Sequence, residues 1–201
     1  MKERLYDAVA ALLDRKGFAE RRARLVSALE GDVVELGAGT GLNLPHYARA
    51  ARVVAVEPDP AYARRLRERA LKARVPVEVV AAHAEALPFP HASFDHAVAS
   101  LVLCSVKEPD VALAEIRRVL RPGGSLVFLE HVRGEGRVAR WQNRLTPVQR
   151  RLADGCHLNR DTAAAIERAG FRLDGLERFP LPGSHPLIRP GIQGAATRTS
   201  S

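Results

Sequence analysis

The sequence predicts an α/β fold in which helices cover both faces of a mostly parallel sheet. Short apolar segments of strand length alternate with amphipathic segments of helix length between residues 32 and 131. The apolar segments contain few polar residues, which is expected of strands buried on both faces. The 201 residues are enough for one domain with a substantial core. Right-handed crossovers then place the loops that follow the parallel strands at one edge of the sheet.

The expected elements follow one another in a regular order. Two helical stretches come first, at residues 3–16 and 18–30, and they are separated near Gly17. The alternating part comes next. Its strands are expected at residues 32–36, 52–57, 77–81, 94–100 and 125–131, and its helices at about 42–50, 60–73 and 109–120.

After Val132 the strict alternation ends. The pattern there predicts helices at 138–152 and 161–169, strands at 171–179 and 192–198, and an irregular proline-rich loop at 180–186. We therefore expect a single domain over residues 1–201. Within it we distinguish a helical N-terminal segment at 1–30 and a substrate-side region at 133–201.

Composition excludes several function classes. No apolar run reaches the roughly 18 residues of a membrane span, and the acidic and basic start of the chain does not resemble a signal peptide. Two cysteines are too few for a disulfide framework, so we expect reduced thiols in the cytoplasm. The net charge of +8 comes mostly from arginines interleaved with acids, which indicates solvated helix faces and not a nucleic-acid partner. The arginine and proline usage also favours a thermophilic source.

A glycine-rich turn follows the first expected strand. Its sequence is Val33-Val34-Glu35-Leu36-Gly37-Ala38-Gly39-Thr40-Gly41. With side chains nearly absent where the chain turns, a ligand can lie directly on the backbone. The next strand ends in Glu57, and an acid at that point is typical of a pocket for a nucleotide-type ligand.

The spacing of the glycines distinguishes among cofactors. A dinucleotide fingerprint would place its third glycine at position 42, which is Leu42 here. Glu35 would repel a pyrophosphate, whereas it suits the cationic amino-acid end of S-adenosylmethionine. Glu57 suits the two ribose hydroxyls of the same molecule. We expect S-adenosylmethionine to be bound by Glu35, Gly37, Ala38, Gly39, Gly41, Asn43, Glu57, Pro58, Ala84, Glu85, Ser100 and Leu101.

Five motifs together resemble those of the class I S-adenosylmethionine-dependent methyltransferases. They are the glycine turn, Glu57-Pro58-Asp59, Ala84-Glu85-Ala86-Leu87-Pro88-Phe89, Ser93-Phe94-Asp95 and Arg118-Val119-Leu120-Arg121-Pro122-Gly123-Gly124. The resemblance implies a Rossmann-like sheet of seven strands in the order 3-2-1-4-5-7-6, with the seventh antiparallel. His83 stands where many members carry an aspartate, which leaves the backbone at Ala84 to meet the adenine.

A narrower resemblance extends into the C-terminal third. Its motifs are Leu101-Val102-Leu103-Cys104-Ser105-Val106, Leu129-Glu130-His131-Val132, Asp154-Gly155-Cys156 and Arg189-Pro190-Gly191-Ile192. They are similar to those of methyltransferase-like S-methyltransferases that act on small thiols, and more loosely to those of quinone-biosynthesis C-methyltransferases and phospholipid N-methyltransferases. The implied substrate is a small, fairly apolar methyl acceptor, with a thiol, a phenol, a quinone or a lipid headgroup amine as candidates.

His131 is the expected catalytic base, because it ends the fifth strand, where open α/β sheets place their ligands. His157 is the second candidate, and Cys104 is interpreted as a packed thiol near the reacting methyl group. Asp154, Cys156 and His157 are nearly contiguous and lack further cysteines nearby, so no metal site is expected.

Alternatives from other classes are an NAD-type oxidoreductase on the same sheet and a catalytically silent module that only binds the cofactor. A nucleic-acid methyltransferase is disfavoured, because Ser100-Leu101-Val102-Leu103 follows the fourth strand in place of an Asn-Pro-Pro-Tyr-type element. The oligomeric state cannot be read from the sequence.

Overall fold

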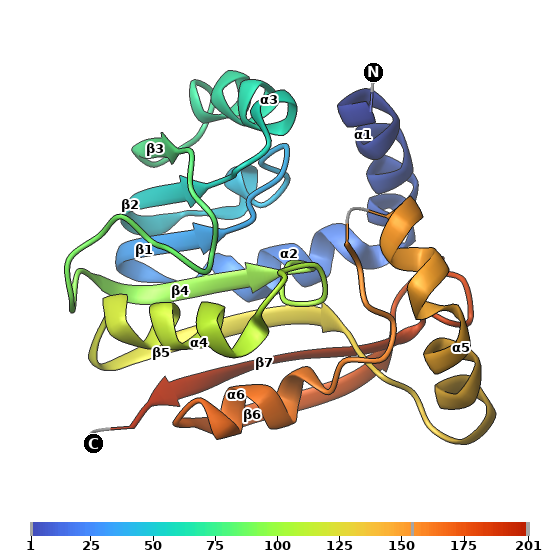
Figure 1. The fold of residues 1–201 in the computed structure, drawn as a ribbon. Coiled ribbons are helices and arrows are strands. Elements are labelled where there is room, and N and C mark those ends of the chain that lie inside the picture. Colours follow the sequence, from blue (N-terminus) through green and yellow to red (C-terminus); the bar gives the residue numbers. More distant parts are fainter. Residues whose placement is uncertain (1, 154, 200–201) are drawn as a thin grey trace.

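The computed structural model describes residues 2–153 and 155–199. Asp154, one of the three residues considered above for a metal, lies outside the described residues. The centre of the fold is a seven-stranded sheet with helices on both faces (Figure 1). Its strands are β1 (Glu30–Leu36), β2 (Arg49–Val56), β3 (Val77–Val80), β4 (Phe94–Ser100), β5 (Leu120–His131), β6 (Phe171–Pro180) and β7 (Pro190–Arg198). The helices are α1 (Lys2–Leu13), α2 (Ala19–Val26), α3 (Pro60–Ala70), α4 (Pro109–Val119), α5 (Gly136–Leu152) and α6 (Thr162–Arg168).

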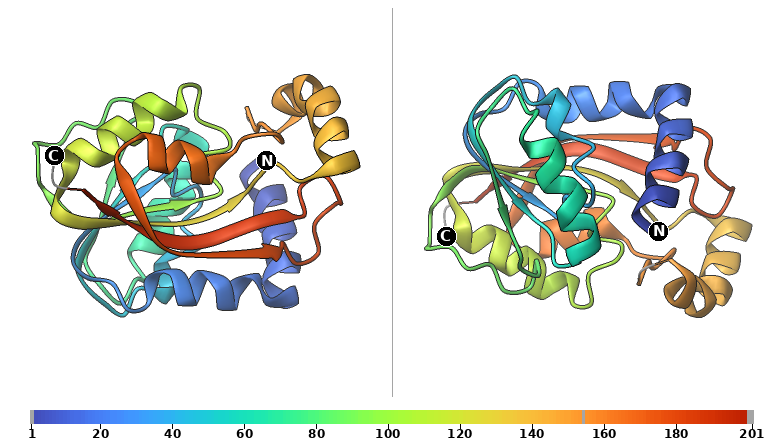
Figure 2. Two further views of the ribbon diagram at one scale, coloured as in Figure 1. Left: turned by 90° about the horizontal axis from the view of Figure 1, so that it is seen from below. Right: turned by 90° about the horizontal axis from the view of Figure 1, so that it is seen from above.

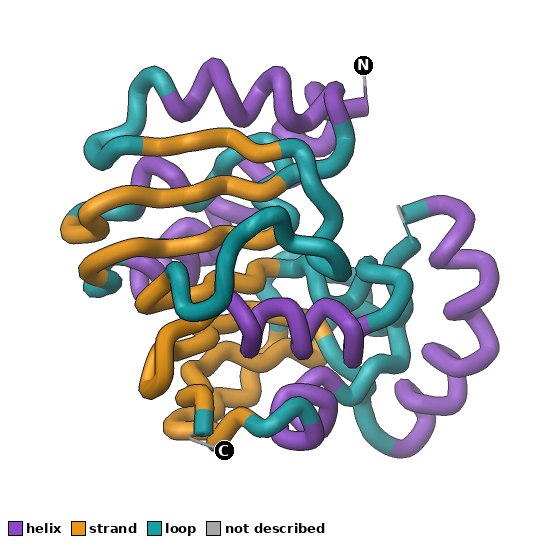
Figure 3. Tube along the Cα trace, turned by 60° about the vertical axis from the view of Figure 1, so that its left-hand side comes forward, coloured by secondary structure: helices purple, strands orange, loops and turns teal. Residues whose placement is uncertain are grey.

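The strand order is β3-β2-β1-β4-β5-β7-β6, and β7 runs antiparallel to both of its neighbours. This confirms the predicted fold class and strand order. The tube drawing shows the strands side by side in one sheet (Figure 3). Because β1, β2, β4 and β5 are parallel, their last residues meet at one edge, which we call the carboxyl edge.

Each face of the sheet has its own core. On one face, Leu25 and Val26 of α2 and Leu66 of α3 pack with Val33 and Val98 of the strands. On the other face, side chains of α4 and α6 pack against strand residues such as Phe128. The views from above and below show α2 on the opposite side of the sheet from α4 and α6 (Figure 2). Burial on both faces explains why the strand sequences are apolar almost throughout.

Two sequence predictions were wrong in detail. The helix expected at about 42–50 is only a single 3₁₀ turn, η2 (Leu44–His46), and β2 already starts at Arg49. Pro45 lies within that turn and lacks the N–H that a longer helix would use there. The fifth strand begins earlier than expected, at Leu120, with a register shift against β4 between Phe94 and His96.

The two N-terminal helices meet at a sharp kink. A π-type turn, η1 (Asp14–Phe18), separates them, and Gly17 inside it has φ +101°. A left-handed backbone at this point is readily adopted only by glycine. The kink carries α1 to the carboxyl edge of the sheet, next to the ends of β1 and β2 (Figure 1). Among the described residues no helix combines the length and apolarity needed to cross a membrane.

Candidate functional site

The glycine turn after β1 has the geometry expected of a ligand cradle. Gly37, Gly39 and Gly41 have φ values of +53°, +58° and +84°. A Cβ on Gly37 would lie 2.3 Å from Val102, and one on Gly41 would lie 2.8 Å from Leu66. At Gly39 the nearest atoms would be 3.9 Å away. The outer glycines are therefore required for packing, whereas bare backbone at Gly39 leaves room for a ligand.

The structure brings Glu57 to this turn, as the sequence predicts. Glu57 directly follows β2, and its carboxylate accepts hydrogen bonds from the backbone N–H of Gly39 at 2.8 Å and of Asp59 at 2.9 Å. Ala38 donates its own N–H to Val56 at 2.9 Å, which ties the turn to the end of β2. Pro58 continues from Glu57 into the cap of α3. Contact between Glu57 and a ribose stays a prediction.

Glu35 and Asn43 form a buried hydrogen-bond network beside the glycine turn. The two carboxylate oxygens of Glu35 accept hydrogen bonds from Asn43 at 2.8 Å and from the Tyr47 hydroxyl at 2.7 Å. Asn43 in turn accepts one from Arg22 of α2 at 3.1 Å. Burial raises the pKa of Glu35, and the hydrogen bonds from Tyr47 and Asn43 oppose that rise. Both side chains thus form hydrogen bonds within the protein next to the glycine turn, and their contact with the cofactor stays a prediction.

The end of β4 is strained and incompletely hydrogen-bonded. Leu101 has φ +56°, a conformation that a leucine rarely adopts. The Ser100 hydroxyl is buried and has no hydrogen-bond partner among the described residues. Strain and an unpaired polar group next to the glycine turn are typical of a site that a ligand completes. Both residues therefore lie where the sequence predicts cofactor contacts.

Glu130, which the sequence reasoning did not assign a function, holds the turn after β4. One oxygen of its fully buried carboxylate accepts hydrogen bonds from Val102 and Leu103, each at 2.9 Å. Burial raises the pKa of Glu130, and these two hydrogen bonds counteract the rise. A carboxylate within an apolar strand is itself a signal that something must pair with it.

Residues 84 and 85, which are expected to meet the adenine, offer a ligand their backbone more than their side chains. Ala84 is buried, but the Glu85 carboxylate accepts the backbone N–H of Lys107 at 2.8 Å, just before α4. The Glu85 side chain therefore fixes the approach to α4, and the backbone of residues 84 and 85 is what this segment offers to a ligand.

Helix α1 adds residues that the sequence reasoning missed. Asp7 accepts a hydrogen bond from the Thr40 hydroxyl at 2.7 Å and pairs with Arg69 of α3 at 3.0 Å. The Tyr6 hydroxyl lies 3.9 Å from the Cβ position of Gly39. Helix α1 therefore covers the glycine turn. The alternating charges of α1 and α3 are the only sequence signal of this contact.

His131 lies at the carboxyl edge together with two cysteines that are distant in sequence. The His131 Nε2 atom is 3.0 Å from the Cys156 sulfur. The sulfurs of Cys104 and Cys156 and a ring nitrogen of His131 all lie within 4.8 Å of one another. All three side chains are buried. The His131 Nδ1 atom has no hydrogen-bond partner among the described residues. The structure thus confirms the placement of His131 at the strand end and adds Cys156 as its neighbour, in place of the contiguous cluster considered from the sequence.

The pKa values of Cys156 and Cys104 shift in opposite directions. The pKa of Cys156 is lowered to about 4, because Cys104 hydrogen-bonds to its sulfur and His131 lies beside it. The pKa of Cys104 is raised well above its usual value by that same hydrogen bond and by burial. Cys156 is therefore the thiolate of the pair, and Cys104 keeps its proton.

Comparisons with known proteins agree with this geometry. A family model described as "Methyltransferase domain" matches residues 34–128. The human thiol S-methyltransferase TMT1A is 39% identical over 171 residues, covering 83% of this chain and 70% of that protein. The phosphatidylethanolamine N-methyltransferase of Cereibacter sphaeroides is 35% identical, covering 81% of this chain and 80% of that protein. The solved structure of geranyl diphosphate methyltransferase in complex with SAM superimposes with a TM-score of 0.71 at 16% identity, covering 92% of this chain and 85% of that one.

Proposed function

Because the chain belongs to the S-adenosylmethionine-dependent methyltransferases, we propose that its methyl acceptor is the sulfur atom of a small, fairly apolar thiol. The observation that carries this proposal is the buried histidine at the carboxyl edge. Its Nδ1 atom has no partner among the described residues, and its Nε2 atom lies 3.0 Å from the Cys156 sulfur. Such a ring can accept the proton that a thiol must lose before it attacks.

The residues at the glycine turn fit the cofactor. Bare backbone at Gly39, the Glu57 carboxylate and the unpartnered Ser100 hydroxyl surround the ends of β1, β2 and β4. We propose that Glu57 binds the ribose hydroxyls and that the turn after β4 meets the amino-acid end. When bound, S-adenosylmethionine supplies a methyl group activated by a sulfonium. The protein has to align the acceptor with that methyl group and exclude water.

His131 lies close to the strained turn after β4. Leu101 donates its backbone N–H to the Leu129 carbonyl at 2.8 Å, and Leu129 precedes His131 by two residues. A base at this position is within reach of an acceptor held over the end of β4. The relatives whose names specify thiol methylation support sulfur as the acceptor atom. The phosphatidylethanolamine relative makes an amine the second candidate.

Titration calorimetry with S-adenosylmethionine and S-adenosylhomocysteine tests the cofactor half of the site. Replacing Glu57 removes hydrogen bonds between a carboxylate and hydroxyls, worth about 1.5–3 kcal/mol each. We expect Glu57→Ala to raise the Kd of the cofactor about 10-fold to 100-fold. Glu68→Ala, at an exposed position of α3, is the matched control and should bind as the wild type does. Equal affinities of the two variants would contradict the role of Glu57.

A turnover panel tests the acceptor half. Small alkyl thiols, phenols, quinols and amines are each offered to the wild type, and S-adenosylhomocysteine release is measured. We expect the highest kcat/KM with a thiol. A higher value with an amine or quinol would move the proposal to that acceptor, and cofactor binding without any turnover would favour a silent binding module.

We propose further that the protein works in the cytoplasm of a thermophile, without a nucleic-acid partner. Two free, buried thiols lying close together support a reducing compartment. Ion pairs of Arg65 and Arg69 with Asp7, and of Arg121 with Asp32, support heat resistance. A melting temperature of an ordinary mesophilic protein would contradict the second point.

A further inference from the structure

The neighbourhood of His131 contains a thiolate where a catalytic histidine commonly has a carboxylate. In hydrolytic triads, a buried anion accepts a hydrogen bond from one ring nitrogen and leaves the other nitrogen to take a proton. Here one ring nitrogen of His131 is 3.0 Å from the Cys156 sulfur, and the other is free of partners among the described residues. Glu130 cannot serve this purpose, because its carboxylate binds the backbone of Val102 and Leu103 instead.

The backbone fixes the sulfur of Cys156 in place. His157 donates its N–H to the Cys104 carbonyl at 2.8 Å, and Cys156 donates its own to Ala153 at 2.8 Å. Arg160 holds the same turn from the other side, with a hydrogen bond of 2.6 Å to the Val106 carbonyl. Two segments that are far apart in sequence are thus joined beside the end of β5. The contact between Cys156 and His131 is therefore a feature of the fold and does not depend on a flexible side chain.

We infer that Cys156 is the positioning residue of His131: its sulfur accepts the Nε2 proton, fixes the tautomer, and leaves Nδ1 to receive the proton of the acceptor. This inference rests on the proposed function and adds a residue to it. The Cys104 sulfur lies within 4.8 Å of the same sulfur, and its thiol donates to the Leu101 carbonyl at 3.6 Å. The other charged groups around the pair are Glu130 on β5 and Arg160 before α6.

The chemical step balances without a further reactant. The S–H bond of the acceptor breaks, and its proton moves to Nδ1 of His131. The acceptor sulfur forms a bond to the methyl carbon while the carbon–sulfonium bond breaks, and that electron pair stays on the sulfur of the departing S-adenosylhomocysteine. The neighbouring thiolate stabilises the imidazolium until the proton leaves for solvent. The products are a methyl thioether, S-adenosylhomocysteine and one proton.

Steady-state kinetics of Cys156 variants test this role. We expect Cys156→Ala to lower kcat about a hundredfold, while KM for the thiol and Kd for S-adenosylmethionine change less than about twofold. Cys156→Asp restores an anion beside Nε2 and should regain at least about tenfold of the lost kcat. Cys104→Ala keeps the Cys156–His131 contact, so its kcat should fall only a few-fold.

Two further measurements do not depend on activity. The ultraviolet absorbance of a thiolate should be present in the wild type at neutral pH, disappear as the pH falls through about 4, and be missing from Cys156→Ser. Metal analysis of the wild type should find no stoichiometric zinc, because a metal on Cys104, His131 and Cys156 would occupy Nε2.

The outcomes separate this inference from the proposed function. If the wild type methylates no thiol, the proposed acceptor is wrong, whatever the spectra show. If the wild type methylates thiols while Cys156→Ala keeps kcat within about threefold, the positioning role is wrong. An absent thiolate signal, or one equivalent of zinc that Cys156→Ser loses, would also overturn it. Calorimetric cofactor binding by each variant shows that a loss of kcat is not a failure to fold.

Discussion

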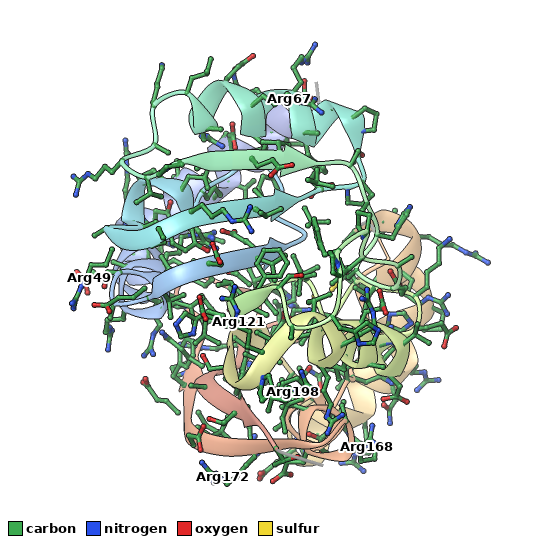
Figure 4. All side chains as sticks on the ribbon, turned by 90° about the vertical axis from the view of Figure 1, so that its left-hand side faces the viewer. Arg49, Arg67, Arg121, Arg168, Arg172 and Arg198 are labelled. Atoms are coloured by element: carbon green, nitrogen blue, oxygen red, sulfur yellow. The ribbon has the colours of Figure 1, made fainter. Side chains whose placement is uncertain are left out.

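The two edges of the central sheet differ in how their polar groups are satisfied. We call the opposite edge, where the parallel strands begin, the amino edge. There Arg121 pairs with Asp32 at 3.0 Å and with Asp95 at 2.6 Å, and Asp32 also pairs with Arg52 at 2.8 Å. Figure 4 labels Arg121, which lies near the middle of that view. These side chains are partly exposed, and their charges alternate.

At the carboxyl edge the polar groups are buried, and several have no partner. The Ser100 hydroxyl, one oxygen of Glu130 and Nδ1 of His131 lack hydrogen bonds among the described residues, and Leu101 has a left-handed backbone. Unpaired buried groups and strain lower stability, so a fold tolerates them where a ligand uses them. The comparison teaches that one sheet can be stable at one edge and reactive at the other. The predictions below test that difference.

The largest effect is expected at the glycine turn. Gly37→Ala would add a methyl group that overlaps Val102, on a backbone whose φ is +53°. Strain and overlap together should cost about 3 kcal/mol, or about a hundredfold in cofactor affinity. Gly136 has a similar φ of +51° with nothing within 4 Å, so Gly136→Ala is the matched control. Titration calorimetry of both variants gives the comparison, and equal cofactor affinity would show that the close approach to Val102 is unimportant.

A smaller effect is expected at Glu130. Glu130→Leu leaves the N–H groups of Val102 and Leu103 unpaired in the core, and we expect the free energy of unfolding to fall by about 2 kcal/mol. Glu130→Gln keeps an acceptor of the same shape and should unfold within about 1 kcal/mol of the wild type at pH 7. Urea unfolding measures both values. Equal losses in the two variants would mean that the carboxylate's charge matters more than its hydrogen bonds.

The smallest effect is expected at the amino edge. The hydrogen bond from Arg121, opposed by burial and aided by Arg52, lowers the pKa of Asp32. A carboxylate with a lowered pKa adds stability that is complete above its unfolded value and is lost as the pH falls through the folded value. Because the side chains of Arg121 and Asp32 are both partly exposed, we expect their ion pair to add less than about 1 kcal/mol to the free energy of unfolding. Urea unfolding of Arg121→Ala should converge with the wild type as the pH falls below the unfolded value of about 3.9 and then through the lower folded value. A constant gap over that range would contradict the ion pair as its cause.

Local sequence signals predicted the parts of the site that are local in the chain. Gly37, Gly39, Gly41 and Glu57 were recognisable because a short turn and a strand end place them within one β-α-β unit. Helix 42–50 was predicted wrongly, since only the single turn Leu44–His46 forms before β2 begins at Arg49. The strand order came from a resemblance of motifs and not from periodicity.

Contacts between distant segments could not be predicted in the same way. Cys156 lies 25 residues after His131, and its position depends on backbone hydrogen bonds to the turn after β4. Tyr47 and Asn43 take both oxygens of Glu35, and nothing in the sequence separates that arrangement from contact with a cation. The sequence places Glu130 in a strand but does not identify the backbone groups that it binds. Residue type gives the chemistry of a side chain, whereas tertiary packing decides which partner it finds.

The place of β7 in the sheet has a consequence for synthesis on the ribosome. β7 is the last strand in the sequence, yet it lies between β5 and β6, and its Gly191 pairs with His131. The outer edge of β5 therefore stays open until residues 190–198 leave the exit tunnel. Until then the emerging polypeptide exposes unpaired main-chain groups beside His131. Early release of the chain would yield a product with a complete glycine turn and an unfinished acceptor side.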